Sequence, residues 1–281
     1  MTRVYGYVRF SFFGRNDTRL SRHTADEEKR FELLYNAQRM RERFYFFEKI
    51  TLPSIRAQIE QDFKVLVVAS DVMPDDYKKQ LNDLVADIPQ IEVVYSSALH
   101  ITDELNPRIA DMTQGNRKST VHFRLDDDDA ICAQTIGLLA STADHARKDE
   151  LISFPRGFFL TMDNGLPRLV RKFEPYIAIG WAYVNKPGQV RNPYQGMHNT
   201  AHHTMPSMLI PRPFAYIHVS HNSSDTKFRK QDKLDRAKNF DSKFEEERDK
   251  IDLQVKKHFP GFSLQSLEHI ISGAPGLKRN R

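Results

Sequence analysis

Strand-like and helix-like segments alternate along the first half of the chain, and no other feature of the sequence constrains the fold as much. Apolar, β-prone runs occur at residues 4–13, 63–71, 91–95 and 121–125. Apolar residues recur at helical spacing in three intervening segments, residues 32–49, 77–85 and 102–112. Strands that alternate with helices form βαβ units. The sequence therefore predicts an α/β fold with a doubly wound, mostly parallel sheet.

The second half has a different pattern. Short strand candidates follow one another at residues 151–154, 157–162, 166–172 and 177–183. The sequence Asp163-Asn164-Gly165 is a hairpin signal, so this half is expected to be mixed or antiparallel. Residues 225–258 mix both charges around a sparse apolar stripe, which predicts solvated C-terminal helices. We expect one domain over residues 1–224, with halves at 1–130 and 131–224, and a charged helical extension over 225–281.

Composition narrows the classes of protein. The chain has 281 residues, enough for one sizeable core, and its net charge of +5 is modest for this length. No zinc-ligand spacing and no nucleic-acid-binding motif occurs, so no nucleic-acid partner is predicted. The single cysteine, Cys132, excludes an internal disulfide and suggests a reducing compartment. With no signal-peptide pattern and no apolar run that could span a bilayer, we expect a soluble, cytoplasmic protein.

Four consecutive aspartates, Asp126 to Asp129, follow the apolar run 121–125 and precede a helical pattern over residues 130–145. Ligands of open α/β sheets bind at the carboxyl ends of the strands, so these carboxylates are expected on the binding side. Adjacent carboxylates repel one another, and a bound divalent cation would neutralise them. The alternative is an aspartate that caps the following helix, with solvated neighbours.

The segment Leu125-Asp126-Asp127-Asp128-Asp129-Ala130 resembles the DxD motif of GT-A nucleotide-sugar glycosyltransferases. More narrowly, it resembles the bacterial putative rhamnosyltransferase family, in which a basic residue and Leu precede an Asp run that ends in Ala. The segment from Tyr216 to Ser224 resembles the aromatic, aliphatic, His, Asn, Ser signature of the same family. The resemblance implies a GT-A fold, a Mg²⁺ or Mn²⁺ ion that holds the diphosphate of a sugar nucleotide, and an acceptor side built by the second half.

The candidate metal ligands are Asp126 and Asp128, because they begin at the strand exit, with Asp127 and Asp129 as the alternative pair. Many GT-A enzymes add a late histidine, and His221 is the candidate here, ahead of His218 and His202. A polar contact is the alternative role for each histidine.

The candidate nucleotide-binding residues lie at strand ends or in the aspartate run: Arg9, Ser11, Asp71, Arg124, Asp126 and Asp127. Arg9 could equally be a surface arginine, and Asp71 a turn or helix-capping residue. Trp181 and Tyr183 could stack on a sugar, but we favour a core position for both.

An inverting transfer needs a general base near the acceptor hydroxyl, and Asp163, Glu174 and Asp225 are the candidates. Inverting and retaining chemistry both stay open.

The predicted function is a metal-dependent glycosyltransferase of the hexosyltransferase type, which moves a sugar from a nucleotide diphosphate sugar to a glycan or other hydroxyl acceptor. One alternative is a module that binds a sugar or nucleotide without turnover. Another is a nucleotidyltransferase, although residues 8–14 do not form the Gly-rich phosphate loop common in that class. Peripheral membrane contact through residues 225–258 is a minority interpretation, because their charges are mixed.

Overall fold

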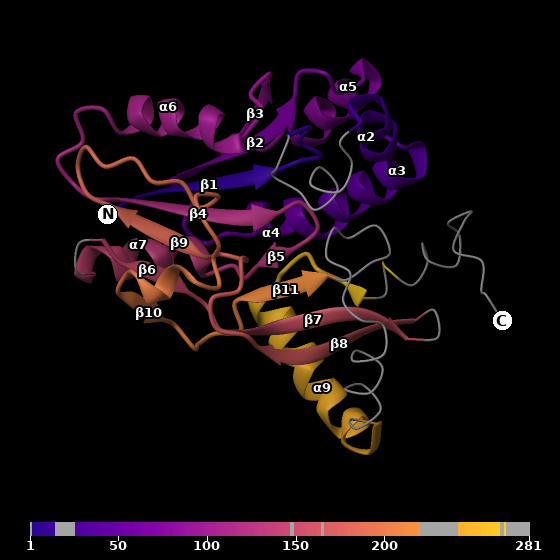
Figure 1. Cartoon of the computed structure of the whole chain (residues 1–281). Coiled ribbons are helices and arrows are strands. Elements are labelled where there is room, and N and C mark those ends of the chain that lie inside the picture. Colours follow the sequence, from indigo (N-terminus) through magenta and orange to yellow (C-terminus); the bar gives the residue numbers. More distant parts are fainter. Residues whose placement is uncertain are drawn as a thin grey trace.

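The computed structural model describes residues 2–14, 26–146, 149–163, 166–219, 241–264 and 267. Two sheets and the helices around them make up the fold (Figure 1). The larger sheet has seven strands, in the order β10 (Ser207–Leu209), β6 (Leu151–Ser153), β9 (Ala182–Asn185), β4 (Thr120–Asp126), β1 (Arg3–Arg9), β2 (Phe63–Ser70) and β3 (Ile91–Ser96).

The centre of this sheet is parallel. β1 pairs in parallel with both β2 and β4, and β3 extends the parallel set beside β2. β9 runs antiparallel to β4 and β6. Nearly every residue of β2 is buried, as expected for a strand covered on both faces. The predicted α/β class with a mostly parallel sheet is confirmed.

Helices cover both faces of the large sheet. The helices of the described residues are α2 (Glu27–Leu34), α3 (Ala37–Phe46), the π-helix η1 (Phe47–Thr51), α4 (Leu52–Arg56), α5 (Asp75–Val85), α6 (Ile101–Thr113), α7 (Thr135–His145), the 3₁₀-helix η2 (Ala201–His203) and α9 (Asp241–His258). On one face α6 packs Leu105 against Tyr7 of β1 and Leu66 of β2. α3, α5 and α7 contribute to the core on the opposite face. This two-sided cover is the doubly wound arrangement.

The smaller sheet has four strands, in the order β5 (Ala130–Ile131), β11 (Tyr216–Val219), β7 (Arg156–Asp163) and β8 (Leu166–Phe173). β7 and β8 form the predicted antiparallel hairpin, and β11 runs parallel to β7 and antiparallel to β5. α9 lies beneath β7 and β8 (Figure 1). The expected mixed character of the second half is therefore confirmed.

Several predicted boundaries were wrong. The helix expected from residue 130 begins at Thr135, because Ala130 and Ile131 pair with β11 instead. The strand expected at 177–183 is limited to β9, and Gly180 before it has a φ of +70°. α2 begins at Glu27, where the side chain of Asp26 accepts a hydrogen bond from the Lys29 N–H at 3.1 Å. The helix expected over 32–49 divides into α2, α3 and η1.

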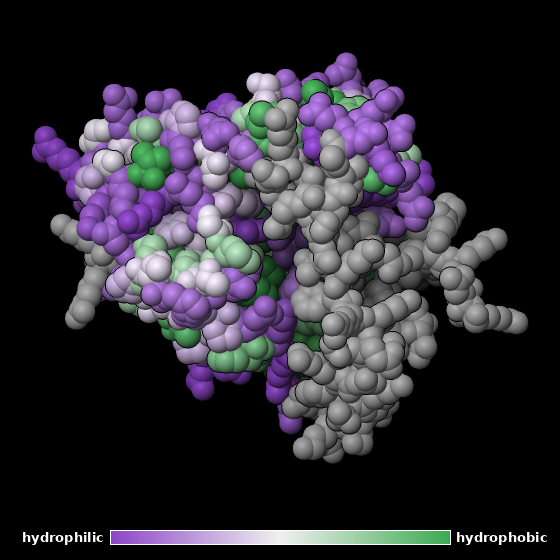
Figure 2. Space-filling model, in the orientation of Figure 1, coloured by the Kyte–Doolittle hydropathy of each residue, from purple (hydrophilic) through white to green (hydrophobic). Residues whose placement is uncertain are grey.

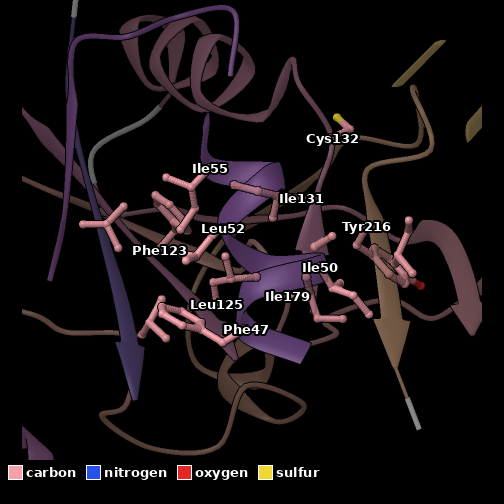
Figure 3. Close-up of a cluster of buried hydrophobic side chains, with 14 of the residues drawn as sticks. Phe47, Ile50, Leu52, Ile55, Phe123, Leu125, Ile131, Cys132, Ile179 and Tyr216 are labelled. Atoms are coloured by element: carbon pink, nitrogen blue, oxygen red, sulfur yellow. The ribbon is translucent and has the colours of Figure 1, made fainter. Parts of the chain in front are cut away.

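One hydrophobic core continues from the large sheet into the small one. Figure 3 shows η1 and α4 inserting Phe47, Ile50, Leu52 and Ile55 toward the strands. These side chains lie in one cluster with Phe123 of β4 and Tyr216 of β11. Cys132 is fully buried at the edge of this cluster.

The surface is mostly hydrophilic on the face shown in Figure 2, with hydrophobic residues in separate patches. In the part of the chain that the structure describes, no helix is long and apolar enough to cross a membrane.

Candidate functional site

The four aspartates form a turn that joins the end of β4 to the start of β5. We call Asp126 to Asp129 the acidic turn. It is closed by a hydrogen bond from the Asp129 N–H to the Asp126 carbonyl oxygen at 3.2 Å. α7 begins only at Thr135, after Gln134, and no side chain caps its first turn. The alternative that an aspartate caps this helix was therefore wrong.

Asp126 lies among basic side chains at the carboxyl edge of the large sheet. Arg124 Nη2 donates a hydrogen bond to Asp126 Oδ1 at 2.8 Å, and Arg9 of β1 stands opposite Asp126 in the strand register. Burial works to raise the pKa of Asp126, but the charges of Arg124 and Arg9 outweigh it and lower this pKa to about 2. Asp126 is therefore ionised at neutral pH, and 35% of its side chain is exposed.

Tyr194 holds the two arginines beside Asp126. The guanidinium carbon of Arg124 is 4.7 Å from the centre of the Tyr194 ring, and that of Arg9 is 5.5 Å away. The Tyr194 hydroxyl donates to the Tyr7 carbonyl oxygen at 3.2 Å. Because burial raises the pKa of Tyr194 to about 12, this phenol keeps its proton at neutral pH. The contacts of both guanidinium groups with the Tyr194 ring hold these cations at the edge of the sheet.

The next two carboxylates share one arginine of α3. Arg43 Nη1 donates to Asp127 Oδ1 and lies 3.9 Å from Asp128 Oδ2. Burial raises the pKa of Asp127 to about 7, against the charge of Arg43, and Asp128 raises it further. Asp127 is 1% exposed and Asp128 is 8% exposed. Asp127 thus faces inward, whereas Asp128 keeps more contact with solvent.

Asp129 joins the turn to the small sheet and to η1. Its Oδ1 accepts a hydrogen bond from the Val219 N–H of β11 at 2.8 Å, and its carbonyl oxygen accepts one from Thr51 Oγ1 at 2.9 Å. Burial, together with the charges of Asp128 and Asp126, holds the pKa of Asp129 well above its usual value. These contacts favour a structural role for Asp129.

A second group of side chains approaches from the small sheet. His218 Nδ1 is 2.6 Å from Lys172 Nζ, and the same lysine nitrogen is 2.6 Å from Glu174 Oε2. Burial and the charge of Lys172 lower the pKa of His218 to about 4, although Asp128 acts in the opposite direction. His218 is therefore neutral at neutral pH. Since an ammonium group can only donate, Nδ1 accepts and Nε2 carries the proton.

Other predicted residues have contacts of their own. The Ser11 hydroxyl accepts a hydrogen bond from Arg39 Nη1 at 3.0 Å, and the residue is buried. Asp71 is exposed just after β2, and its N–H donates to the Ser96 carbonyl oxygen at 3.0 Å. The ring of His202 stacks on Tyr176 with their centres 4.0 Å apart. Trp181 and Tyr183 are buried, so the prediction of a core position for both is confirmed.

Three predicted site residues are not covered. His221 and Asp225 lie outside the described residues, and so does the side chain of Asp163. Their roles stay predictions. Among the described residues, no three or more His, Cys, Asp or Glu side chains are grouped so that they could hold a metal ion.

Sequence reasoning missed three residues that surround the acidic turn: Arg43, Lys172 and Tyr194. Arg43 lies in a helical pattern, where an arginine is ordinarily expected on the solvent side. Lys172 and Tyr194 reach the site through pairings far apart in sequence, and no local signal marks either one.

Comparison with known proteins gives a family and several distant structural neighbours. A family model described as "Putative rhamnosyl transferase" matches residues 3–233. No curated protein matches the sequence.

The structural neighbours include residues 1–349 of TarS from S. aureus, with a TM-score of 0.42 at 12% identity over 78% of this chain and 60% of that chain. The same TarS segment in complex with UDP gives a TM-score of 0.41 at 14% identity, over 78% and 61% of the two chains. A putative nucleotide-diphospho-sugar transferase from Desulfovibrio desulfuricans G20 gives 0.39 at 8% identity, over 79% and 83%. The chain thus spans about 60% of the length of the TarS structures.

Proposed function

This chain belongs to the putative rhamnosyltransferase family, and from that premise we propose that it transfers a sugar from a nucleoside diphosphate sugar to a hydroxyl acceptor, with Mg²⁺ or Mn²⁺ bound at the acidic turn. One observation carries the proposal. Asp126 and Asp128 lie together at the carboxyl edge of a parallel sheet, and neighbouring arginines keep Asp126 ionised. The family's description makes rhamnose the first donor sugar to test.

The donor set of the acidic turn suits a hard divalent cation. Carboxylate oxygens are the ligands that Mg²⁺ prefers and that Mn²⁺ accepts. Asp126 offers an ionised carboxylate, and Asp128 is the more exposed of the two acids near Arg43. Asp127 and Asp129 are the most deeply buried acids of the turn, at 1% and 3% exposure, which favours Asp126 and Asp128 as the metal pair. When bound, the cation would supply Lewis-acid stabilisation of the charge on the diphosphate.

The basic residues at this edge would bind the donor. Arg9 and Arg124 can attract the diphosphate oxygens, because guanidinium groups form charge-assisted hydrogen bonds with phosphate. Asp71, exposed at the end of β2, is the proposed contact for the nucleoside. Asp127 fixes the position of Arg43, and through it the backbone of the acidic turn.

Glu174 is the general-base candidate whose side chain is described. Its carboxylate can take a proton from an acceptor hydroxyl, and Lys172 Nζ lies 2.6 Å from Glu174 Oε2. His218, with a protonated Nε2, would donate a hydrogen bond to the acceptor or to the departing phosphate. Asp163 and Asp225 remain predicted alternatives for the base, and His221 remains the predicted third metal ligand.

The test is a thermal-shift screen of the full chain against UDP, GDP, dTDP and CMP, each with and without Mn²⁺. We expect one diphosphate to raise Tm by roughly 5 °C at saturating concentration, because a ligand that binds only the folded state stabilises it by mass action. The shift should need the metal and disappear in Asp128→Ala. Asp62→Ala is the matched control, since Asp62 is an exposed acid at the opposite end of β2 and should leave the shift unchanged.

Turnover is tested separately, by release of the nucleoside diphosphate from dTDP-rhamnose and from UDP-glucose. Glu174→Gln should keep the metal-dependent shift but lower the rate by about 10²-fold or more. Binding without consumption of any donor would favour the non-catalytic module. If no nucleotide shifts the wild-type protein in any metal condition, the donor site does not exist at the acidic turn.

A further inference from the structure

A basic pocket lies on the side of the small sheet that faces α9. It has a volume of about 740 Å³. Five arginine and lysine side chains line it, namely Arg156, Arg171, Arg212, Lys250 and Lys257. No acidic side chain is among the described residues that line it. The whole chain carries a net charge of only +5, so positive charge is concentrated here well beyond the average surface.

The floor of the basic pocket is aromatic. Phe214 stacks on Phe158 with ring centres 4.7 Å apart, and this stack fixes its position against the core. The guanidinium carbon of Arg156 is 4.6 Å from the centre of the Phe214 ring, and that of Arg171 is 5.9 Å away. Leu253 adds an apolar side chain that is 65% exposed. Both guanidinium groups are thus held against an aromatic surface within the pocket.

α9 contributes Lys250 and Lys257 from one helix face. Lys250, Leu253, Gln254 and Lys257 line the pocket at intervals of three, four and seven residues. Side chains at this spacing share one side of a helix. Arg248 and Lys256 are exposed on the same helix but do not line the pocket. The pocket therefore has a defined set of cations rather than a uniformly charged helix.

The basic pocket is separate from the acidic turn because the two use opposite faces of the small sheet. Phe158 of β7 pairs with Arg171 of β8, and both face α9. The next residues along each strand, Phe159 and Lys172, point to the other face and contact His218. Alternate side chains of a strand lie on opposite faces of a sheet. The sheet therefore stands between the pocket and the proposed donor site.

We infer that the basic pocket binds a ligand that carries at least two phosphate groups joined to an apolar or ring-containing part. Phosphate is the anion that paired guanidinium groups bind best, and several cations around one cavity can hold more than one phosphate. Phe214 and Leu253 provide the surface for the apolar part. The volume is within the range of small-ligand sites. Such a phosphate could belong to a soluble molecule or to an anionic lipid headgroup.

The experiment measures binding of inorganic triphosphate by calorimetry, and of vesicles of cardiolipin, a lipid with two phosphate groups, in phosphatidylcholine by co-sedimentation. The test variant is the double substitution Lys250→Glu with Lys257→Glu. We expect it to weaken binding about tenfold or more. The matched control is Arg248→Glu with Lys256→Glu, which makes the same charge change on the same helix outside the pocket and should alter affinity less than about twofold. All four residues are exposed, so folding should be preserved.

The two arms distinguish the sources of phosphate. Pocket-dependent binding of triphosphate indicates a soluble ligand, and pocket-dependent binding of anionic but not of pure phosphatidylcholine vesicles indicates a headgroup. Asp128→Ala should leave both kinds of binding intact, which separates this inference from the donor site. The inference is overturned if neither probe binds, if both double variants weaken binding equally, or if only Asp128→Ala abolishes it.

Discussion

His122 is a titratable side chain that the protein buries completely in the middle of β4. Its ring lies between Tyr5 and Tyr7, with centres 5.3 and 5.9 Å away. Nδ1 is 2.7 Å from the Tyr7 hydroxyl, and Nε2 is 2.8 Å from Thr120 Oγ1. Hydroxyl groups can both donate and accept, so a neutral imidazole satisfies both contacts. Burial lowers the pKa of His122 from 6.5 to about 3.

This depressed pKa predicts a loss of stability in mild acid. Between pH 6.5 and about 3 the unfolded chain binds a proton at this position that the folded chain does not, so folding is favoured less as the pH falls. From pH 7 to pH 5 the free energy of unfolding should drop by about 2 kcal/mol through this residue. Urea unfolding at the two pH values measures the drop. His122→Gln, which keeps a donor and an acceptor but cannot titrate, should remove this part of it.

An exposed histidine provides the comparison. His145 lies at the end of α7. In His145→Gln the free energy of unfolding should depend on pH as it does in the wild-type protein. If the free energy of unfolding depends on pH equally in the wild type and in His122→Gln, the folded protein stabilises the protonated His122 ring and this prediction is wrong.

Among the elements, the close contact between β7 and β11 depends on Gly157, which has no side chain. A Cβ atom added to Gly157 of β7 would overlap the ring of Tyr216, which is fully buried on β11. Neither strand can shift freely, because β11 also pairs with β5 and β7 pairs with β8. The glycine therefore lets an aromatic side chain fill the core between the two sheets.

Gly157→Ala should destabilise the protein by about 1–3 kcal/mol, because overpacking forces a buried ring or a strand to move. Urea unfolding gives the value. Gly137→Ala is the matched substitution, since Gly137 is in α7 and its nearest neighbour, Glu60 Cβ, is 4.0 Å from the added atom. There alanine should be neutral or stabilise by up to about 1 kcal/mol. Equal effects at the two positions would show that the β7–β11 contact adjusts readily.

The parallel strands of the first half could be predicted from sequence, because each is a mostly apolar, β-prone run bounded by polar turns. Residues 63–70 and 91–96 are examples. β5 could not be predicted, because Ala130 and Ile131 are strand only through β11, more than eighty residues later. The same pairing explains why the acidic turn leads into a strand rather than a helix. Likewise, local sequence placed Asp126 and Asp128 at the end of a strand, whereas Arg43 and Lys172 come near the turn only through tertiary packing.

In the whole molecule, one hydrophobic core includes both the sheets and the C-terminal helix α9. Residues 225–281 were predicted to be a charged extension of the domain. In the structure, Ile251 and Val255 of α9 are buried in the same cluster as Val121 and Leu125 of β4. The backbone is joined as well, since the Ala133 N–H donates to the His258 carbonyl oxygen at 2.8 Å. A continuous core of this kind predicts that the described sheets and α9 unfold in one cooperative step.

Val255→Ala tests whether this core is continuous. The sole tryptophan of the chain, Trp181, is buried with Tyr183 of the large sheet, so its fluorescence reports on that sheet and not on α9. Removing the two buried methyl groups should cost about 1–3 kcal/mol. The urea midpoint followed by Trp181 fluorescence should fall together with the midpoint followed by far-ultraviolet circular dichroism. Leu253→Ala, at a side chain 65% exposed on the same helix, should leave both midpoints in place. If Val255→Ala shifts the circular dichroism midpoint alone, α9 unfolds independently of the sheets.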